Sequence, residues 1–296
     1  MTAIQQYLLP FLCIFAGINV VLSQVTNNPT NSPVTSSNPT NSPVTSSKPT
    51  QNEVPSDGPT SSFAPTDSAM PTAPIDERTA LIRFYDALNG DSWYDKDGWK
   101  TEGSFCFWYG ITCDNETQSM VIGIDLQANY LSGRFPTQIQ YLPNLVDLDV
   151  DRNYITGSIV SEIGLLSNLE YLSFSRNFWT GTIPTELGQL SKLKSLDAAP
   201  FRTGNSFTGT LPSELGRLSN LFYVDLSRHA LNGTLPTELG GMSALKELFL
   251  YQNNLSGTIP TELSLCSSLE ELFLRVSFML NVSLLITLFL ILTRST

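Results

Sequence analysis

Apolar and polar positions between Val121 and Leu274 follow one pattern that recurs about every 24 residues. Its clearest copy is LKELFLYQNNLSGTIPTELSLC, which runs from Leu245 to Cys266. A self-similar period of this length is typical of a stacked solenoid, in which function is carried by the surfaces that stacking creates. Copies begin at Val121, Leu145, Leu169, Leu193, Leu221 and Leu245, and a fragment begins at Leu269.

Each copy opens with alternating apolar and polar residues, which predicts one short β-strand. In the second copy the apolar side chains are expected to point inward and Asp147, Asp149 and Asp151 outward. Burying the apolar side chains of one repeat contributes about 10 to 20 kcal/mol, whereas ordering its backbone and side chains costs about 30 kcal/mol or more. A single repeat is therefore unstable, and neighbours must stack with their strands in one parallel sheet.

A second feature of the repeat is an asparagine at the point where the chain turns out of the strand. Its amide can satisfy backbone groups that the turn leaves unpaired, so we expect a structural ladder. The fifth copy has His229 instead, which either substitutes a ring nitrogen for the amide or acts as a pH-sensitive group; we favour the substitution. Cys266 takes a position held by leucine or methionine in other copies, which predicts a buried thiol. The asparagines are Asn129, Asn153, Asn177, Asn205 and Asn253.

Residues 76–118 have a different pattern, which predicts an N-terminal cap. Apolar residues at helical spacing indicate a helix with Asp76 as its N-cap and Gly90 just past its end. The stretch after this helix holds three of the four tryptophans and ends in CFWYGITC. In a secreted chain Cys106 and Cys113 are expected to pair, which stabilises the fold by about 2.5 kcal/mol. A zinc site is disfavoured, because two cysteines without nearby histidines do not complete a ligand set.

Two segments of different composition precede the cap. Residues 1–23 contain an uncharged apolar run followed by a serine, which predicts a cleaved secretory signal peptide; the alternative, a signal anchor, would need a longer run. Residues 24–75 are rich in Asn, Pro, Ser and Thr, and NPTNSPVTSS occurs in them twice. So polar a segment cannot form a core, which predicts a disordered stalk that is either O-glycosylated or an unmodified spacer.

Residues 276–293 form an apolar tail after the repeat fragment. Three interpretations stay open: a C-terminal membrane anchor with Arg294 on the cytoplasmic side, a tail removed on GPI attachment, and the non-native end of a truncated gene product. Sequons at Asn115, Asn232 and Asn254 predict surface N-glycosylation in a secreted chain.

The cap and the repeats together resemble a known class. The cap is similar to the motif C-x-W-x-G-V-x-C of plant-type leucine-rich repeat proteins, and the phrase L-x-G-x-I-P in the repeats is typical of the same class. The resemblance implies an α/β solenoid, namely a right-handed leucine-rich repeat superhelix with a parallel sheet on its concave face, extra short strands and an N-terminal helical cap. The chain departs from the class in lacking a kinase sequence and a C-terminal cysteine pair, and in having the stalk. The cap residues that carry the resemblance are Trp93, Trp99, Cys106, Trp108, Gly110, Ile111 and Cys113.

The outward strand positions build the surface that we expect to carry function. Projected as a column, they read Asp125, Asp149, Ser173, Asp197, Asp225, Phe249 and Phe273, so one end is acidic and the other aromatic. A second column flanks it and reads Gly123, Asp147, Tyr171, Ser195, Tyr223, Glu247 and Glu271. The aspartates repel one another, and Arg152, Arg176 and Arg228 are expected to offset part of this repulsion. Two interpretations fit, a solvated polar face and a groove for a basic peptide or a sugar chain. The predicted ligand-binding residues are Asp125, Asp147, Asp149, Asp151, Tyr171, Tyr223, Asp225, Phe249 and Tyr251.

Other chemistry on this face is disfavoured. A calcium site at Asp147, Asp149 and Asp151 would need more oxygen ligands held by a turn. We expect no carboxyl of the column to have its pKa raised by burial, which argues against glycoside hydrolysis. An insertion of four residues in the fourth copy carries Phe201 and Arg202, which either recognise a partner or belong to a neutral loop.

The net charge and the absence of certain motifs argue against several classes of function. The net charge is −11, and the sequence has no basic stripe for nucleic acid, no Ser/His/Asp set and no phosphate-binding loop. We therefore expect no enzyme, no cofactor, no metal site and no nucleic-acid partner. The sequence predicts a cell-surface or secreted recognition protein that binds a peptide, protein or glycan on its concave face, with a membrane-bound co-receptor as a candidate partner. The alternatives are a structural cell-wall or adhesion glycoprotein and, from the resemblance alone, an inhibitor of a wall-degrading enzyme.

Overall fold

The computed structural model describes residues 19–23, 75–200 and 204–275. Most of the segment predicted as a signal peptide, residues 24–74 of the stalk, the inserted Phe201 and Arg202, and the apolar tail lie outside the described residues. Our interpretations of these segments therefore stay predictions. None of the helices in the described ranges has the length and apolar composition needed to cross a bilayer.

The N-terminal cap is built on the helix α2 (Glu77–Ala87), as predicted. Its N-cap is confirmed, because the Asp76 carboxylate accepts a hydrogen bond of 2.8 Å from the backbone N–H of Thr79. Short 3-10 helices follow at η1 (Gly90–Ser92) and η2 (Phe105–Phe107). The predicted Cys106–Cys113 disulfide is present, and the rings of Tyr85, Trp93, Trp99 and Trp108 pack in series beside α2.

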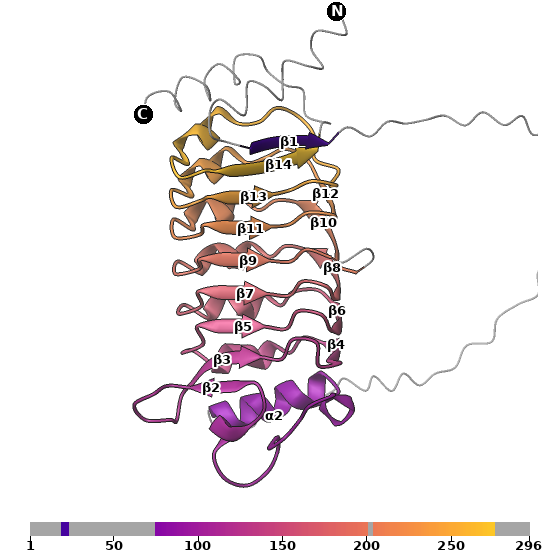
Figure 1. Ribbon diagram of the computed structural model, residues 1–296, viewed down its shortest axis with the longest axis vertical. Coiled ribbons are helices and arrows are strands. Elements are labelled where there is room, and N and C mark those ends of the chain that lie inside the picture. Colours follow the sequence, from indigo (N-terminus) through magenta and orange to yellow (C-terminus); the bar gives the residue numbers. More distant parts are fainter. Residues whose placement is uncertain (1–18, 24–74, 201–203, 276–296) are drawn as a thin grey trace, which may run out of the picture. The chain divides into compact units, whose positions relative to one another are not determined.

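The repeats form one parallel sheet, as predicted, with one strand from each copy and one from the fragment (Figure 1). At one end β2 (Ile111–Cys113) pairs antiparallel with the first repeat strand. At the other end β1 (Asn19–Ser23) pairs in parallel with the last repeat strand, although it belongs to the segment predicted as a signal peptide. The repeat strands are β3 (Val121–Asp125), β5 (Asp147–Asp149), β7 (Tyr171–Ser173), β9 (Ser195–Asp197), β11 (Tyr223–Asp225), β13 (Glu247–Phe249) and β14 (Glu271–Arg275).

A second, five-stranded parallel sheet is formed by the extra short strands that the resemblance implied. Its strands are β4 (Ser132–Arg134), β6 (Tyr154–Gly157), β8 (Phe178–Thr182), β10 (Ser206–Thr210) and β12 (Ala230–Asn232). Each repeat then continues into a 3-10 helix behind the main sheet, and these helices are η3 (Thr137–Tyr141), η4 (Ser161–Leu165), η5 (Thr185–Gln189), η6 (Ser213–Arg217), η7 (Thr237–Gly241) and η8 (Thr261–Leu265). Glycine lets neighbouring turns touch: a Cβ on Gly216 would lie 1.9 Å from the carbonyl oxygen of Glu238.

The predicted asparagine ladder is confirmed and lies inside the solenoid. The amide nitrogen of Asn177 donates to the carbonyl oxygens of Val150, at 2.8 Å, and Ser175, at 3.0 Å, and its oxygen accepts from the backbone N–H of Ile155 at 3.0 Å. The residue before it, Arg176, has a φ of 52°, a left-handed conformation that costs about 1 to 2 kcal/mol. The ladder therefore holds the chain in a strained turn and links each repeat to the preceding one.

His229 occupies the ladder position of the fifth repeat, as predicted, but it replaces only part of the amide chemistry. Its Nδ1 lies 3.2 Å from the carbonyl oxygen of Asn205, and its ring packs against Phe207. Its Nε2 is buried and has no hydrogen-bond partner among the described residues. Burial lowers the pKa of His229 from 6.5 to about 4, so the ring is neutral in the folded protein at neutral pH.

We predict that Asn177→Ala lowers the free energy of unfolding by about 2 to 5 kcal/mol, because it leaves the buried Val150 carbonyl and Ile155 N–H without their amide partner. Urea denaturation followed by circular dichroism measures this change. The matched control is Asn168→Ala, which removes two exposed hydrogen bonds, one to the carbonyl of Pro143 and one from the ammonium of Lys192. We expect the control to cost less than about 1 kcal/mol, and equal losses in the two variants would contradict the ladder's role.

We predict that wild-type protein loses stability relative to His229→Asn as the pH falls from about 6.5 to about 4. The histidine pKa is lower in the folded state, so the unfolded chain binds the proton first and acid favours unfolding, by about 3 kcal/mol in total. The difference between the two unfolding free energies at pH 7.5 and pH 4 measures this effect, since the carboxyl groups titrate in both proteins. A difference that does not change with pH would refute it.

Candidate ligand-binding surface

Strand register places the outward side chains in the two columns that the sequence predicted. In the first column, directly opposed residues follow the order Asp125, Asp149, Ser173, Asp197, Asp225, Phe249 and Phe273. In the second they follow the order Gly123, Asp147, Tyr171, Ser195, Tyr223, Glu247 and Glu271. Opposed residues on adjacent strands lie about 5 Å apart, so both columns run across the face. The first column has its acidic end at β3 and β5, whereas the second carries Asp147 at β5 and two glutamates at β13 and β14.

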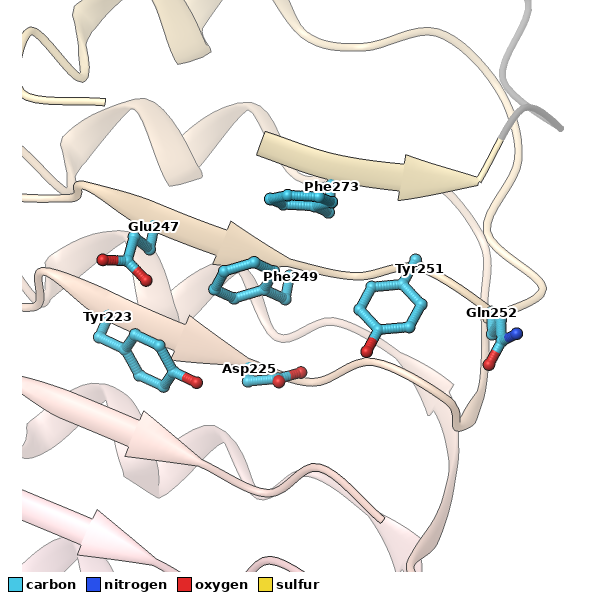
Figure 2. Close-up of a pocket in the computed structure, with 7 residues that line it drawn as sticks. All are labelled: Tyr223, Asp225, Glu247, Phe249, Tyr251, Gln252 and Phe273. Carbon is cyan, nitrogen blue, oxygen red and sulfur yellow. The ribbon is translucent and has the colours of Figure 1, made fainter. Parts of the chain in front are cut away.

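The aromatic end of these columns contains a pocket of about 460 Å³ (Figure 2). The rings of Phe249 and Phe273 stack with their centroids 4.9 Å apart, and Tyr223 packs against Phe249 at 5.8 Å. Figure 2 shows the hydroxyls of Tyr223 and Tyr251 directed toward the side of Asp225, which gives the pocket a polar edge. The lining residues are Tyr223, Asp225, Glu247, Phe249, Tyr251, Gln252 and Phe273.

Asp225, at the polar edge of the pocket, has compensating partners on the chain itself. Its carboxylate accepts a 2.9 Å hydrogen bond from the backbone N–H of Ser227, and the nearby Arg228 guanidinium favours its ionised form. Burial outweighs both and raises the pKa of Asp225. Arg228 also lies over the Tyr251 ring, 5.6 Å from its centroid. Burial and the charges of nearby carboxylates raise the pKa of Tyr223, so its hydroxyl stays protonated and can donate a hydrogen bond.

The acidic end corrects one of our predictions, because burial does raise carboxyl pKa values there. Burial is the main cause that raises the pKa of Asp149 to about 6, and repulsion from Asp125, Asp151 and Asp147 adds to it. The pKa of Asp147 is also raised, by burial and by Asp125. The sequence pattern shows which residues point outward, but it does not show that neighbouring strands shield them from water.

The arginines that we expected to offset the aspartate charges interact with only some of these aspartates. Arg152 forms an ion pair of 3.2 Å with Asp151, and Arg176 also favours the ionised form of Asp151. Neither Asp147 nor Asp149 belongs to an ion pair among the described residues. Nor do acidic, histidine and cysteine side chains gather into a metal-ligand set anywhere in these ranges.

The predicted site residues thus separate into two groups on one face. Tyr223, Asp225, Phe249 and Tyr251 meet in the pocket, whereas Asp125, Asp147, Asp149 and Asp151 lie at the acidic end. Tyr171 stands between them with the Lys194 ammonium 5.7 Å from its ring centroid. The site list omitted Glu247, Phe273 and Gln252; the first two belong to the predicted columns, while Gln252 gave no signal because it follows the strand.

Two further sequence predictions concern residues away from this face. Cys266 is a buried free thiol, as predicted, and burial raises its pKa to about 11. The sequon residues Asn115, Asn232 and Asn254 are all exposed, so their side chains are accessible to modification. Their glycosylation stays a prediction.

Comparison with known families identifies the cap and the repeats. The model of the leucine rich repeat N-terminal domain matches residues 74–114, which is the predicted cap. The leucine rich repeat model matches residues 168–190 and 244–266. These matches coincide with α2, the disulfide and two of the stacked repeats.

Several plant proteins resemble parts of this chain in sequence or in fold. The leucine-rich repeat receptor-like protein kinase TDR of Arabidopsis thaliana is 45% identical over 47 residues, which are 16% of this chain and 4% of that protein. The ectodomain of GASSHO1/SCHENGEN3 from Arabidopsis thaliana, in complex with CASPARIAN STRIP INTEGRITY FACTOR 2, superposes with a TM-score of 0.63 at 31% identity, over 69% of this chain and 24% of that one. The Arabidopsis HAESA ectodomain in complex with an IDA peptide hormone ligand superposes with a TM-score of 0.58 at 32% identity, over 67% and 32%.

The chain therefore spans less than a third of the length of these two receptor structures. The parallel sheet, the second strand of each repeat and the disulfide-bonded helical cap agree with the family matches. In its cap, its repeats and its fold, this chain thus resembles plant-type leucine-rich repeat proteins.

Proposed function

We propose that this protein is a non-catalytic recognition protein, secreted or held at the cell surface, whose concave face binds a peptide or an extended segment of another protein. The pocket at β11, β13 and β14 is the observation that carries this proposal. It combines aromatic walls with a small number of polar groups, which is the usual composition of a ligand pocket. Tyrosine and phenylalanine side chains of this kind are common anchors in protein interfaces.

The energetic cost of the acidic end supports the same function. Asp149 is half-buried and Asp147 is exposed, and the pKa of each is raised, first by desolvation and then by neighbouring carboxylates. Neither takes part in an ion pair within the described ranges. Ionising them at neutral pH therefore destabilises the fold. Such groups concentrate at functional sites, where a ligand can supply the missing partner.

The related structures support a peptide or protein ligand. The HAESA ectodomain was solved with a peptide hormone ligand, and the GASSHO1/SCHENGEN3 ectodomain with CASPARIAN STRIP INTEGRITY FACTOR 2. Each of the two structures superposes on more than two thirds of the residues of this chain. We propose the same mode of binding, and the extracellular location that it requires, for the present chain.

A glycan remains the second ligand class, because aromatic rings and carboxylates also suit sugar hydroxyls. In the structural alternatives, a wall or adhesion glycoprotein, residues 24–75 would carry the function instead of the concave face. Deleting that segment separates the two classes of function. Wall association that is lost while concave-face binding persists would favour the structural class.

We predict that a display library of random decapeptides, selected on the purified full chain, yields peptides that bind wild-type protein and lose at least tenfold in affinity on Phe249→Ala. An aromatic anchor removed from a pocket typically costs about 1.4 kcal/mol or more, which is that factor. Tyr154→Ala, which removes an exposed ring from the second sheet, is the matched control and leaves affinity unchanged. Peptides that bind both variants like wild type would place recognition elsewhere and reject the proposal.

We predict that Asp149→Asn raises the melting temperature at pH 7 but not at pH 3.5. The folded pKa of about 6 lies above the unfolded value of 3.8, so the ionised carboxyl destabilises the fold at pH 7. That destabilisation disappears as the pH falls from about 6 toward 3.8, because the folded state then takes up the proton. Thermal melts of both proteins at the two pH values test this, and Glu238→Gln, at an exposed 3-10 helix, should change neither.

A further inference from the structure

A row of exposed aromatic rings runs from the cap along the second sheet, away from the concave face. Tyr94 belongs to the cap, Tyr130 precedes β4, and Tyr154 and Phe178 are the first residues of β6 and β8. Successive ring centroids lie 5.9, 6.0 and 6.2 Å apart, and the four residues are between 44% and 79% exposed. We call them the aromatic row; none of them lines the pocket of Figure 2.

The fold does not need rings at these positions. Ser206 and Ala230 occupy the first positions of β10 and β12, and both strands form without an aromatic residue there (Figure 1). Tyr130 is moreover held at a φ of 64°, a left-handed conformation that is unfavourable for an aromatic residue. Backbone strain of this kind is found mainly at functional sites.

The aromatic row presents open ring faces beside hydroxyl groups. The planes of Tyr154 and Phe178 are 12° from parallel, and their centroid distance of 6.2 Å shows that the rings overlap only in part. The Tyr130 ring is tilted by 39° from that of Tyr154. Strand register places Ser132 opposite Tyr154 and Thr156 opposite Phe178. Apolar faces therefore alternate with a border of hydroxyls along one surface.

The charges around the aromatic row favour an uncharged ligand. The rings and the hydroxyl border consist of uncharged side chains, although the net charge of the chain is −11. Arg152 and Arg176 act on Asp151, the first through an ion pair of 3.2 Å. Arg134, opposite Thr156, adds one cation at the border. An acidic glycan has a carboxylate on each sugar and would need a cation at each step of the row.

A sugar chain fits this surface better than a protein or a nucleic acid. Anchors of a protein partner bind in desolvated pockets, whereas these rings are open to solvent. Bases stack on such rings where a cationic groove holds the phosphates, and this chain is acidic. A pyranose has an apolar C–H face that packs on an aromatic ring, and hydroxyls that bond to serine and threonine.

We infer that the aromatic row binds an uncharged, extended glycan of β-(1→4)-linked sugars. Such a chain is a flat ribbon, so consecutive sugars can pack on consecutive rings, whereas an α-(1→4)-linked chain coils away from a straight row. The hydroxyls of Ser132 and Thr156 lie beside the rings, where they can bond to the rim of the sugars. This site does not use the concave face and is independent of the proposed function.

Isothermal titration calorimetry on the full chain tests the inference with cellohexaose, a β-(1→4)-linked hexamer of glucose, and its α-linked counterpart maltohexaose. We expect cellohexaose to bind and maltohexaose to bind at least about fivefold more weakly, because only the flat chain contacts several rings. Raising the salt concentration to about 0.5 M should leave the affinity unchanged, since no ion pair forms.

Variants then assign the contacts. Tyr154→Ala and Phe178→Ala should each weaken cellohexaose binding by about fivefold or more, since each removes one ring face. Tyr154→Phe should bind like wild type, because it keeps the ring. The matched control is Tyr141→Ala, which removes an exposed ring from η3, outside the aromatic row. Thermal melts of all variants show whether any loss of affinity comes from unfolding.

Each contrary result has a clear meaning. No binding of cellohexaose, equal affinity for maltohexaose, or no effect of Tyr154→Ala and Phe178→Ala would overturn the inference. So would tighter, salt-sensitive binding of hexagalacturonate, which would indicate an acidic glycan, or library peptides that depend on Tyr154, which would indicate a protein partner. A failure to bind cellohexaose would leave the proposed function standing, because that function is tested at Phe249 on the concave face.

Discussion

The structure depends on one constraint, which is that each repeat must satisfy the backbone groups of its neighbour. The ladder amides do this at the turn out of each strand, where Asn153 bonds to Leu126 and Asn177 to Val150 in the preceding repeat. These bonds are buried, so their loss is not compensated by water. Stability is therefore shared between adjacent repeats, and the terminal units need covers, which α2 and β2 provide at the N-terminal end.

A regular ladder has a functional consequence, because it holds strand after strand in the same register. Outward positions then form straight columns whose chemistry can change from repeat to repeat without disturbing the core. In this chain the first column passes from aspartates at β3 and β5 to phenylalanine rings at β13 and β14, and the second adds Tyr223 at β11 and two glutamates beyond it. The scaffold is common to many proteins, whereas this gradient of chemistry belongs to the present chain and is the basis of the proposed recognition.

Two buried titratable groups give the fold opposite responses to acid. His229 replaces a ladder amide and resists protonation, so acid weakens the repeat that contains it. Asp149 resists ionisation, so acid relieves the strain at the acidic end of the columns. The two effects fall in overlapping pH ranges and partly cancel in the whole protein. The stability of the whole protein can therefore change little in mildly acidic solution while the core and the concave face respond in opposite directions.

The sequence by itself determined the features that depend on local period. These include the strand of each repeat, the ladder column of Asn177 and its neighbours, the N-cap at Asp76, the Cys106–Cys113 pair and the register of the outward columns. Only the tertiary structure decided how far the outward side chains are buried and which residues they contact. The raised pKa of Asp149, the position of Arg228 on Tyr251 and the entry of Gln252 into the pocket arise between residues brought together by stacking. Burial and cross-repeat contacts depend on the neighbouring strands on both sides, and a one-dimensional pattern does not contain that information.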